Sequence, residues 1–96
     1  MLTYVGVDVA KESLEVAALS GDGEILRVQL GNDEAAHQAL VSWLGKYELC
    51  QVVCEATGSY HQRLVKHLQA CGVWVSVINP AQARDYAKSQ RQHRGH

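Results

Sequence analysis

The sequence contains no apolar run that approaches the ~20 residues needed to span a membrane. It also lacks a basic start followed by an apolar segment and a small-residue cleavage site, so we expect a protein that is not secreted. No repeat, low-complexity segment or linker interrupts its 96 residues, a length that suits one domain and is too short for two. Hydrophobic residues make up 47% of the chain, which indicates a globular fold with a core.

Cysteines are too few and too irregularly spaced for a disulfide framework. There are three, and no two of them form a C-x-x-C pair. Cys50 and Cys54 would share one face of a strand but lie too far apart along it to bond each other. A zinc site that includes His61 is an alternative, although the spacing matches no known ligand pattern. We therefore expect buried free thiols in a reducing cytoplasm.

Basic residues are scarce in the first part of the chain, and acidic residues are scarce in the last part. Residues 1–60 contain nine acids and three bases, a net charge of −6, whereas residues 61–96 contain six bases against one acid, a net charge of +5. An acidic half beside a basic half suits a polyanionic substrate that also requires cations. Two ordinary solvated faces would give the same split, and this alternative stays open.

Alternating or continuous apolar residues predict five strands, at residues 4–9, 14–19, 24–30, 50–54 and 73–78. Residues 20–23 read Ser-Gly-Asp-Gly, which is typical of a hairpin turn, so the first three strands should form an antiparallel meander. The fourth strand is apolar on both faces apart from Gln51, as expected of a central strand covered on two sides. Trp43 and Trp74 are expected in the core.

Three helices are predicted between and after these strands. Asn32 suits an N-cap, and the helix dipole favours the acids that follow it. Ser59 and Gln62 form a capping box that should open a second helix. Asn79 and Pro80 predict the start of a third helix, which runs to about residue 88. The buried side of the second helix is expected to contain Tyr60, Leu64, Leu68 and Cys71.

The order β-β-β-α-β-α-β-α predicts one α/β domain over residues 1–90. A meander followed by two right-handed crossovers most simply gives a mixed sheet of order 3-2-1-4-5 with flanking helices. This is the ribonuclease H-like, or RuvC-like, arrangement, and its first and fourth strands are parallel neighbours at the centre. Residues 91–96 have no apolar face and are expected to form a disordered tail.

Both predicted central strands end on a carboxylate, Asp8 in the first and Glu55 in the fourth. Because neighbouring strands lie roughly 4.8 Å apart, the two groups would share a proton or bind a cation. Hard oxygen ligands suit Mg²⁺ or Mn²⁺, and paired metal ions stabilise in-line phosphodiester chemistry. We therefore predict that Asp8 and Glu55 are catalytic metal ligands. Ordinary solvated acids at a loop and before a helix are the alternative.

Three motifs carry a family resemblance. Residues 6–11 read G-V-D-V-A-K, residues 55–60 read E-A-T-G-S-Y, and residues 78–86 read I-N-P-A-Q-A-R-D-Y. In this order and spacing they resemble the amino-terminal DEDD, RuvC-like domain of transposases of the insertion sequence 110 family, over nearly the whole chain. The resemblance implies that Asp8 and Glu55 are the first two acids of a metal-binding tetrad. It also implies a bacterial or archaeal cytoplasmic recombinase that acts on DNA strands and is guided by a structured RNA.

The resemblance also implies functional parts that these 96 residues do not contain. Family members continue beyond residues 91–95 into a K-T-D-x-x-D-A segment with the third and fourth acids, and then into a domain with a nucleophilic serine. His96 is either native or the edge of a purification tag. We therefore expect the 96 residues alone to be inactive. Without the segment that normally packs near it, the sheet would expose apolar surface, so we also expect a homo-oligomer.

Nucleic-acid contacts are expected mainly in the basic half, where phosphate binding would be independent of sequence and sensitive to salt. The candidates are Lys11, Arg63, Lys66, Arg84, Lys88, Arg91 and Arg94. Lys11 follows Asp8 by three residues, and an ordinary exposed turn lysine is the simpler interpretation of it.

Other functions remain open. A nucleotide-binding domain of the actin and sugar-kinase kind opens with a similar meander and aspartate, but it needs a glycine soon afterwards, and residues 9–13 contain none. A nuclease that resembles Holliday-junction resolvases would share the fold. A non-catalytic module that binds nucleic acid or mediates assembly suits a chain with two of the four acids.

Overall fold

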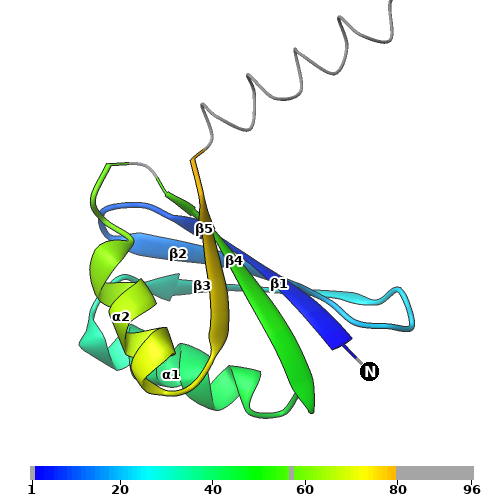
Figure 1. Cartoon of the computed structure of the whole chain (residues 1–96). Helices are drawn as coiled ribbons and strands as arrows, with labels where there is room; N and C mark the ends of the chain where they lie inside the picture. The colour runs from blue at the N-terminus through cyan, green and yellow to red at the C-terminus, as the bar shows by residue number, and fades with distance from the viewer. Residues whose placement is uncertain (1, 57, 80–96) are drawn as a thin grey trace, which may run out of the picture.

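Five strands form one mixed sheet in the order β3-β2-β1-β4-β5, which confirms the predicted fold. The computed structural model describes residues 2–56 and 58–79. Its elements, drawn in Figure 1, are β1 (Leu2–Val9), β2 (Ser13–Leu19), β3 (Ile25–Gly31), α1 (Glu34–Leu44), β4 (Leu49–Ala56), α2 (Gln62–Ala70) and β5 (Trp74–Ile78). Strand β1 is antiparallel to β2 and parallel to β4. The predicted helix from residue 80 and the predicted tail at 91–96 lie outside the described residues.

The turn between β2 and β3 has the predicted hairpin chemistry. The carboxylate of Asp22 accepts hydrogen bonds from the Ser20 hydroxyl at 2.6 Å and from the Glu24 amide at 3.0 Å. Gly23 has a φ of +86°, which a residue with a side chain rarely adopts. These hydrogen bonds also lower the pKa of the Asp22 carboxyl group, because they favour its charged form. The turn therefore fixes how β3 returns along β2.

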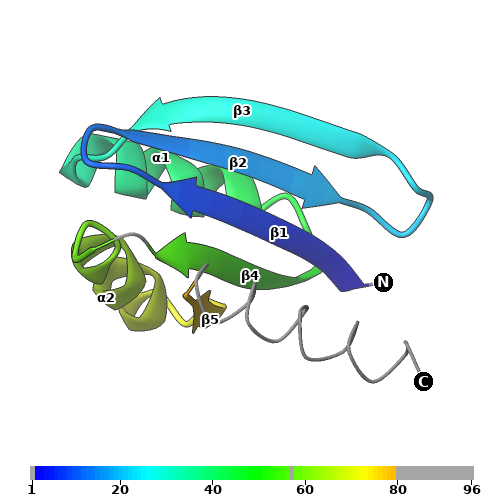
Figure 2. The ribbon, with the colours of Figure 1, turned by 90° about the horizontal axis from the view of Figure 1, so that it is seen from above.

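Both helices lie on the same face of the sheet (Figure 1), and Figure 2 shows β1 and β2 crossing in front of α1. The core forms where this face meets the helices, because inward-pointing residues alternate along β1 and β2 while leucines line the inner sides of α1 and α2. Its buried members are Val5, Val7, Val9, Leu14, Val16, Ala18, Leu40, Leu44, Val52, Cys54, Leu64 and Leu68. None of the helices among the described residues is long and apolar enough to cross a membrane.

The other face of the sheet, here called the open face, carries exposed apolar side chains. One row of paired residues crosses all five strands and contains Ile25, Leu19, Tyr4, Gln51 and Trp74. Tyr4 is 51% exposed and Trp74 is 57% exposed. The prediction that Trp74 belongs to the core is therefore wrong. Among the described elements, α1 and α2 cover one face of β4 and none covers the other, so the expectation that β4 is covered on both sides is not met within residues 2–56 and 58–79.

Two helix starts differ from those predicted. Asp33, not Asn32, caps α1, and its carboxylate accepts a hydrogen bond from the Ala36 amide at 2.8 Å. Helix α2 begins at Gln62 after a turn, and no side chain caps it, so the predicted capping box with Ser59 does not form. In the predicted buried stripe of α2, Leu64 and Leu68 are buried, whereas Tyr60 and Cys71 are exposed.

The three cysteines are free thiols, as predicted, but only Cys54 is fully buried. Burial raises the pKa of the Cys54 thiol to about 11, so this group stays protonated near neutral pH. Cys50 is partly buried, and burial raises its pKa as well. Cys71 is exposed at the end of α2.

Candidate functional site

Asp8 and Glu55 are direct neighbours in the sheet. They are paired in the parallel register of β1 and β4, and they lie on the open face because Val7 and Cys54, one position earlier, point into the core. Asp8 is exposed and Glu55 is partly buried. The structure thus brings the two predicted site acids together near the carboxyl ends of the two central strands.

A third acid, Glu15, completes this row. Glu15 in β2 is the antiparallel partner of Asp8, so Asp8 lies between Glu15 and Glu55. Glu15 was not among the predicted site residues, although the strand pattern could have indicated it. A short connection between β1 and β2, closed by a 2.9 Å hydrogen bond from the Ala10 amide to the Ser13 carbonyl, sets the register. Once Val9 pairs with Leu14, Asp8 must pair with Glu15.

The acid row borders a hollow of about 420 Å³ on the open face. Arg27 lies on one side of the hollow and Glu55 and Ile78 on the other, with Gly6 in its floor. A Cβ atom added at Gly6 would meet no atom within 4 Å, so internal packing does not require this glycine. Glycine in the middle of a strand usually lowers stability, and here it leaves space beside Asp8.

The donor chemistry of the acid row fits a hard divalent cation. Carboxylate oxygens are the ligands that Mg²⁺ and Mn²⁺ prefer, and three acids side by side repel one another unless a cation or a proton intervenes. Within residues 2–56 and 58–79, however, no three His, Cys, Asp or Glu side chains are placed to hold one metal ion together. The described residues therefore do not form a metal site with three protein ligands.

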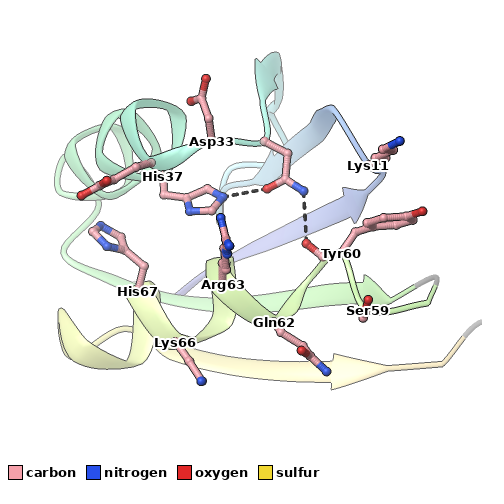
Figure 3. A pocket seen from close by; sticks show the side chains of 11 residues that line it. Lys11, Asp33, His37, Ser59, Tyr60, Gln62, Arg63, Lys66 and His67 are labelled. Atoms are coloured by element: carbon pink, nitrogen blue, oxygen red, sulfur yellow. Dashed lines mark hydrogen bonds between the residues drawn. The ribbon is translucent and has the colours of Figure 1, made fainter.

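A second cavity, of about 760 Å³, lies at the same end of the sheet on the side of the helices. Figure 3 shows its side chains, which come from the β1–β2 connection, the start of α1 and the turn and helix after β4. The Arg63 guanidinium points into it toward His37, while Lys66 and Gln62 extend away from it. The lining residues are Lys11, Asn32, Asp33, Glu34, His37, Ser59, Tyr60, Gln62, Arg63, Lys66 and His67.

The Asn32 side chain ties together the two connections that follow the acid-bearing strands. Its amide nitrogen donates to the Ala10 carbonyl at 2.8 Å and to the Tyr60 carbonyl at 3.1 Å. Its oxygen lies 2.7 Å from Nε2 of His37, the distance of a hydrogen bond that the imidazole donates. Asn32 is therefore not a helix cap. It fixes the chain just beyond Asp8 and Glu55, and the three bonds are here called the Asn32 clamp.

His37 forms the buried end of this clamp. Its side chain is 5% exposed, and its ring centroid lies 6.1 Å from that of His67. Burial lowers the pKa of His37, and the charges of His67 and Arg63 lower it further, while Asp33 and Glu34 oppose this shift. The neutral imidazole, with its proton on Nε2, is the form that suits this environment.

The lowered pKa of His37 predicts that stability falls on acidification. Below the ordinary histidine pKa of about 6.5 the unfolded chain gains a proton that folded His37 takes up only at lower pH. The free energy of unfolding should therefore decrease as the pH drops below about 6.5. Once the pH is below the pKa of His37 in the folded protein, this histidine should cause no further decrease. Urea unfolding over this range should show a weaker decrease in His37→Gln than in the original chain. An equal decrease in both would contradict the assignment.

The structure separates the predicted nucleic-acid contacts into groups. Lys11, Arg63 and Lys66 line the cavity on the helix side. Arg84, Lys88, Arg91 and Arg94 lie outside the described residues. The predicted metal ligands lie on the opposite face at the same end of the sheet, so the two sets are close along the chain but do not share one pocket.

Comparisons with known proteins identify similar sequences. The model of the DEDD family of insertion sequence 110, described as a transposase, matches residues 5–95. A pilin gene-inverting protein of Moraxella bovis is 26% identical over 91 residues, which are 91% of this chain and 28% of that protein. The chain thus spans 28% of the length of this curated relative.

Two solved structures share the fold at low sequence identity. RuvC of Thermus thermophilus, solved in complex with a Holliday junction substrate, has a TM-score of 0.62 and 13% identity, covering 88% of this chain and 69% of that one. A Bacteroides thetaiotaomicron protein with an actin-like ATPase fold also has a TM-score of 0.62, with 14% identity, covering 79% of this chain and 32% of that one. At these identities the likeness concerns the fold alone, and it confirms a RuvC-like sheet.

Proposed function

The chain belongs to the DEDD transposase family of insertion sequence 110, and from this membership we propose that it is the metal-binding part of a recombinase that acts on DNA strands. The observation that carries the proposal is the pairing of Asp8 with Glu55 on the open face of the two central strands. Recombination by the longer protein, measured with and without Mg²⁺ and after substitution of either acid, tests this function.

In this proposal Asp8 and Glu55 hold Mg²⁺ or Mn²⁺ through their carboxylate oxygens. The bound metal would stabilise the attacking and leaving oxygens of a phosphodiester. Glu15 adds negative charge on the far side of Asp8, which raises the attraction of the row for a cation. The hollow over Gly6 leaves space for the sugar-phosphate backbone to approach. Because the remaining two acids of the tetrad are expected elsewhere, the 96 residues alone should not cleave DNA.

Recognition of the substrate would be shared between this chain and other parts of the longer protein. Lys11, Arg63 and Lys66, together with the four basic residues at positions 84–94, supply phosphate contacts that do not read sequence. A guide RNA would then select the target, and the site of action would be the bacterial or archaeal cytoplasm. The low net charge of the chain is compatible with this division, because the basic residues are concentrated in one half.

The exposed row on the open face supports self-association of the 96-residue chain. We expect its sedimentation coefficient to increase with concentration, because burial of Leu19, Tyr4 and Trp74 between copies removes apolar surface from water. Leu19→Lys should abolish this increase. Gln69→Lys, which adds the same charge on α2, should not. A monomer at all concentrations in the original chain would contradict the expectation.

Three alternatives are separated from this proposal by simple measurements. A nucleotide-binding domain shares the fold, and it predicts that ATP raises the melting temperature of the chain. A non-catalytic module for nucleic acid or assembly predicts that the longer protein recombines normally without either acid. A resolvase-like nuclease predicts cleavage of four-way junctions in preference to linear duplexes.

A further inference from the structure

The cavity on the helix side has a cation at its centre without a partner in the described chain. The Arg63 side chain points into the cavity (Figure 3) and makes no hydrogen bond or ion pair with any residue in 2–56 or 58–79. A guanidinium carries five donors in a planar fork that matches two oxygens of a phosphate or a carboxylate. The Arg63 fork is therefore available to a ligand.

The wall opposite Arg63 is fixed by the Asn32 clamp. His37 is buried and hydrogen-bonded to Asn32, which in turn holds the chain at Ala10 and Tyr60. All donors of the Asn32 amide group are used within the protein. The wall is consequently rigid and presents few free groups, and the ligand would be recognised from the Arg63 side.

The charge around Arg63 favours an anion. Lys11 lines the cavity with Arg63. Lys66 lines it too, although its side chain extends away from the centre, and the histidines add no negative charge. Of the two acids in the lining, Asp33 already accepts a hydrogen bond from the amide of Ala36 at the start of α1. Glu34 is exposed at the rim and opposes the binding of an anion. The three cations outnumber these two acids.

We propose that this cavity binds one backbone phosphate of a nucleic-acid strand, with Arg63 as the bidentate contact and Lys11 as a supporting cation. The identity of the ligand rests on the proposed function. The position of the cavity supports it, because Lys11 follows Asp8 by three residues, a span of about 10 Å at most. A strand that passes over the end of β1 could place one phosphate at the acid row and another at Arg63.

Binding of a single-stranded oligonucleotide to the 96-residue chain tests the proposal. Arg63→Gln should weaken binding about tenfold and reduce the slope of log affinity against log salt by about 0.7, as expected for one lost phosphate contact. Arg63→Lys keeps the charge but loses the fork, so its affinity should lie between those of Arg63→Gln and the original chain. Glu34→Gln should tighten binding, since it removes the opposing charge.

Lys46→Gln is the matched control, because it also removes one exposed cation. Lys46 lies beyond the far end of α1, 4.6 Å from the ring centroid of Trp43 and away from the cavity. Affinity and salt slope should be unchanged in this variant. Equal losses in Arg63→Gln and Lys46→Gln would overturn the proposal, since binding would then follow net charge alone. Circular dichroism of each variant should show the same secondary structure as the original chain.

Two further probes define the ligand. An oligonucleotide with an uncharged methylphosphonate backbone should not depend on Arg63, because it offers no phosphate charge. A polyglutamate peptide that bound with the same Arg63 dependence as the oligonucleotide would overturn the assignment and indicate an acidic protein partner. If the oligonucleotide binds in an Arg63-dependent way but the longer protein does not recombine DNA, the proposed function is refuted and the phosphate site is not. Normal recombination without such binding would refute this site alone.

Discussion

Asp8→Asn or Glu55→Gln in the longer protein is expected to lower the recombination rate by about a thousandfold or more. A bound divalent ion contributes several kcal/mol to the stabilisation of charge in the transition state, and each 1.36 kcal/mol corresponds to about a tenfold change in rate. Each substitution removes one metal-binding charge and changes the shape of the side chain very little. Because both side chains point away from the core, the fold should be retained.

The measurement is the recombination rate over a series of Mg²⁺ concentrations. Glu24→Gln is a suitable control, since it makes the same chemical change in the turn between β2 and β3, outside the acid row. Thermal unfolding of all variants should be similar to that of the original protein. Full activity in Asp8→Asn or Glu55→Gln would refute the metal site, whereas an equal loss in Glu24→Gln would show that the effect is not specific.

Asn32→Leu is expected to lower the free energy of unfolding by about 3 kcal/mol. It removes three hydrogen bonds at about 1 kcal/mol each, and it leaves the buried imidazole of His37 without its acceptor. Small domains are stable by only about 5–15 kcal/mol, so this is a large fraction of the total. Recombination should also fall at temperatures where the variant is folded, because the connections after Asp8 and Glu55 are no longer tied together.

Two further variants, at positions 32 and 33, distinguish loss of the Asn32 clamp from non-specific destabilisation. Their urea unfolding and recombination should be measured in the same way. Asn32→Asp retains an acceptor for His37 but places a carboxylate against two carbonyl oxygens, so it should also be destabilised. Asp33→Asn should be close to the original protein, since asparagine caps a helix about as well as aspartate. Unchanged stability in Asn32→Leu would mean that the clamp contributes nothing measurable.

The strand order and the pairing of the two site acids could be predicted because each depends on local pattern and general topology. The valines of β1 alternate clearly, the Asp22–Gly23 turn returns the chain, and a right-handed crossover places β4 beside β1. Asp8 and Glu55 occupy corresponding places near the ends of their strands, so their side-by-side position follows from the same topology.

The clamp and the open face could not be predicted because they depend on tertiary contacts. Asn32 has the residue type and position of a helix cap, yet its amide is used by carbonyls from two distant segments, and Asp33 takes the cap. Tyr60 and Trp74 are large and apolar, so the sequence indicates burial, but no described element covers the face on which Trp74 lies. Hydrophobic pattern does not say how many faces of a sheet are covered.

The parallel pairing of β1 with β4 has a consequence for how the sheet assembles. The partners Asp8 and Glu55 lie half the chain apart, so β1 is synthesised long before the strand that will flank it. Until β4 docks, β1 is the unpaired edge of a three-stranded ribbon, and such edges pair readily with other chains. Contacts of this range also close slowly. Under the proposed function, a nascent chain could not hold metal between these two acids until α1 has crossed over and β4 has docked, so metal binding would follow completion of the sheet.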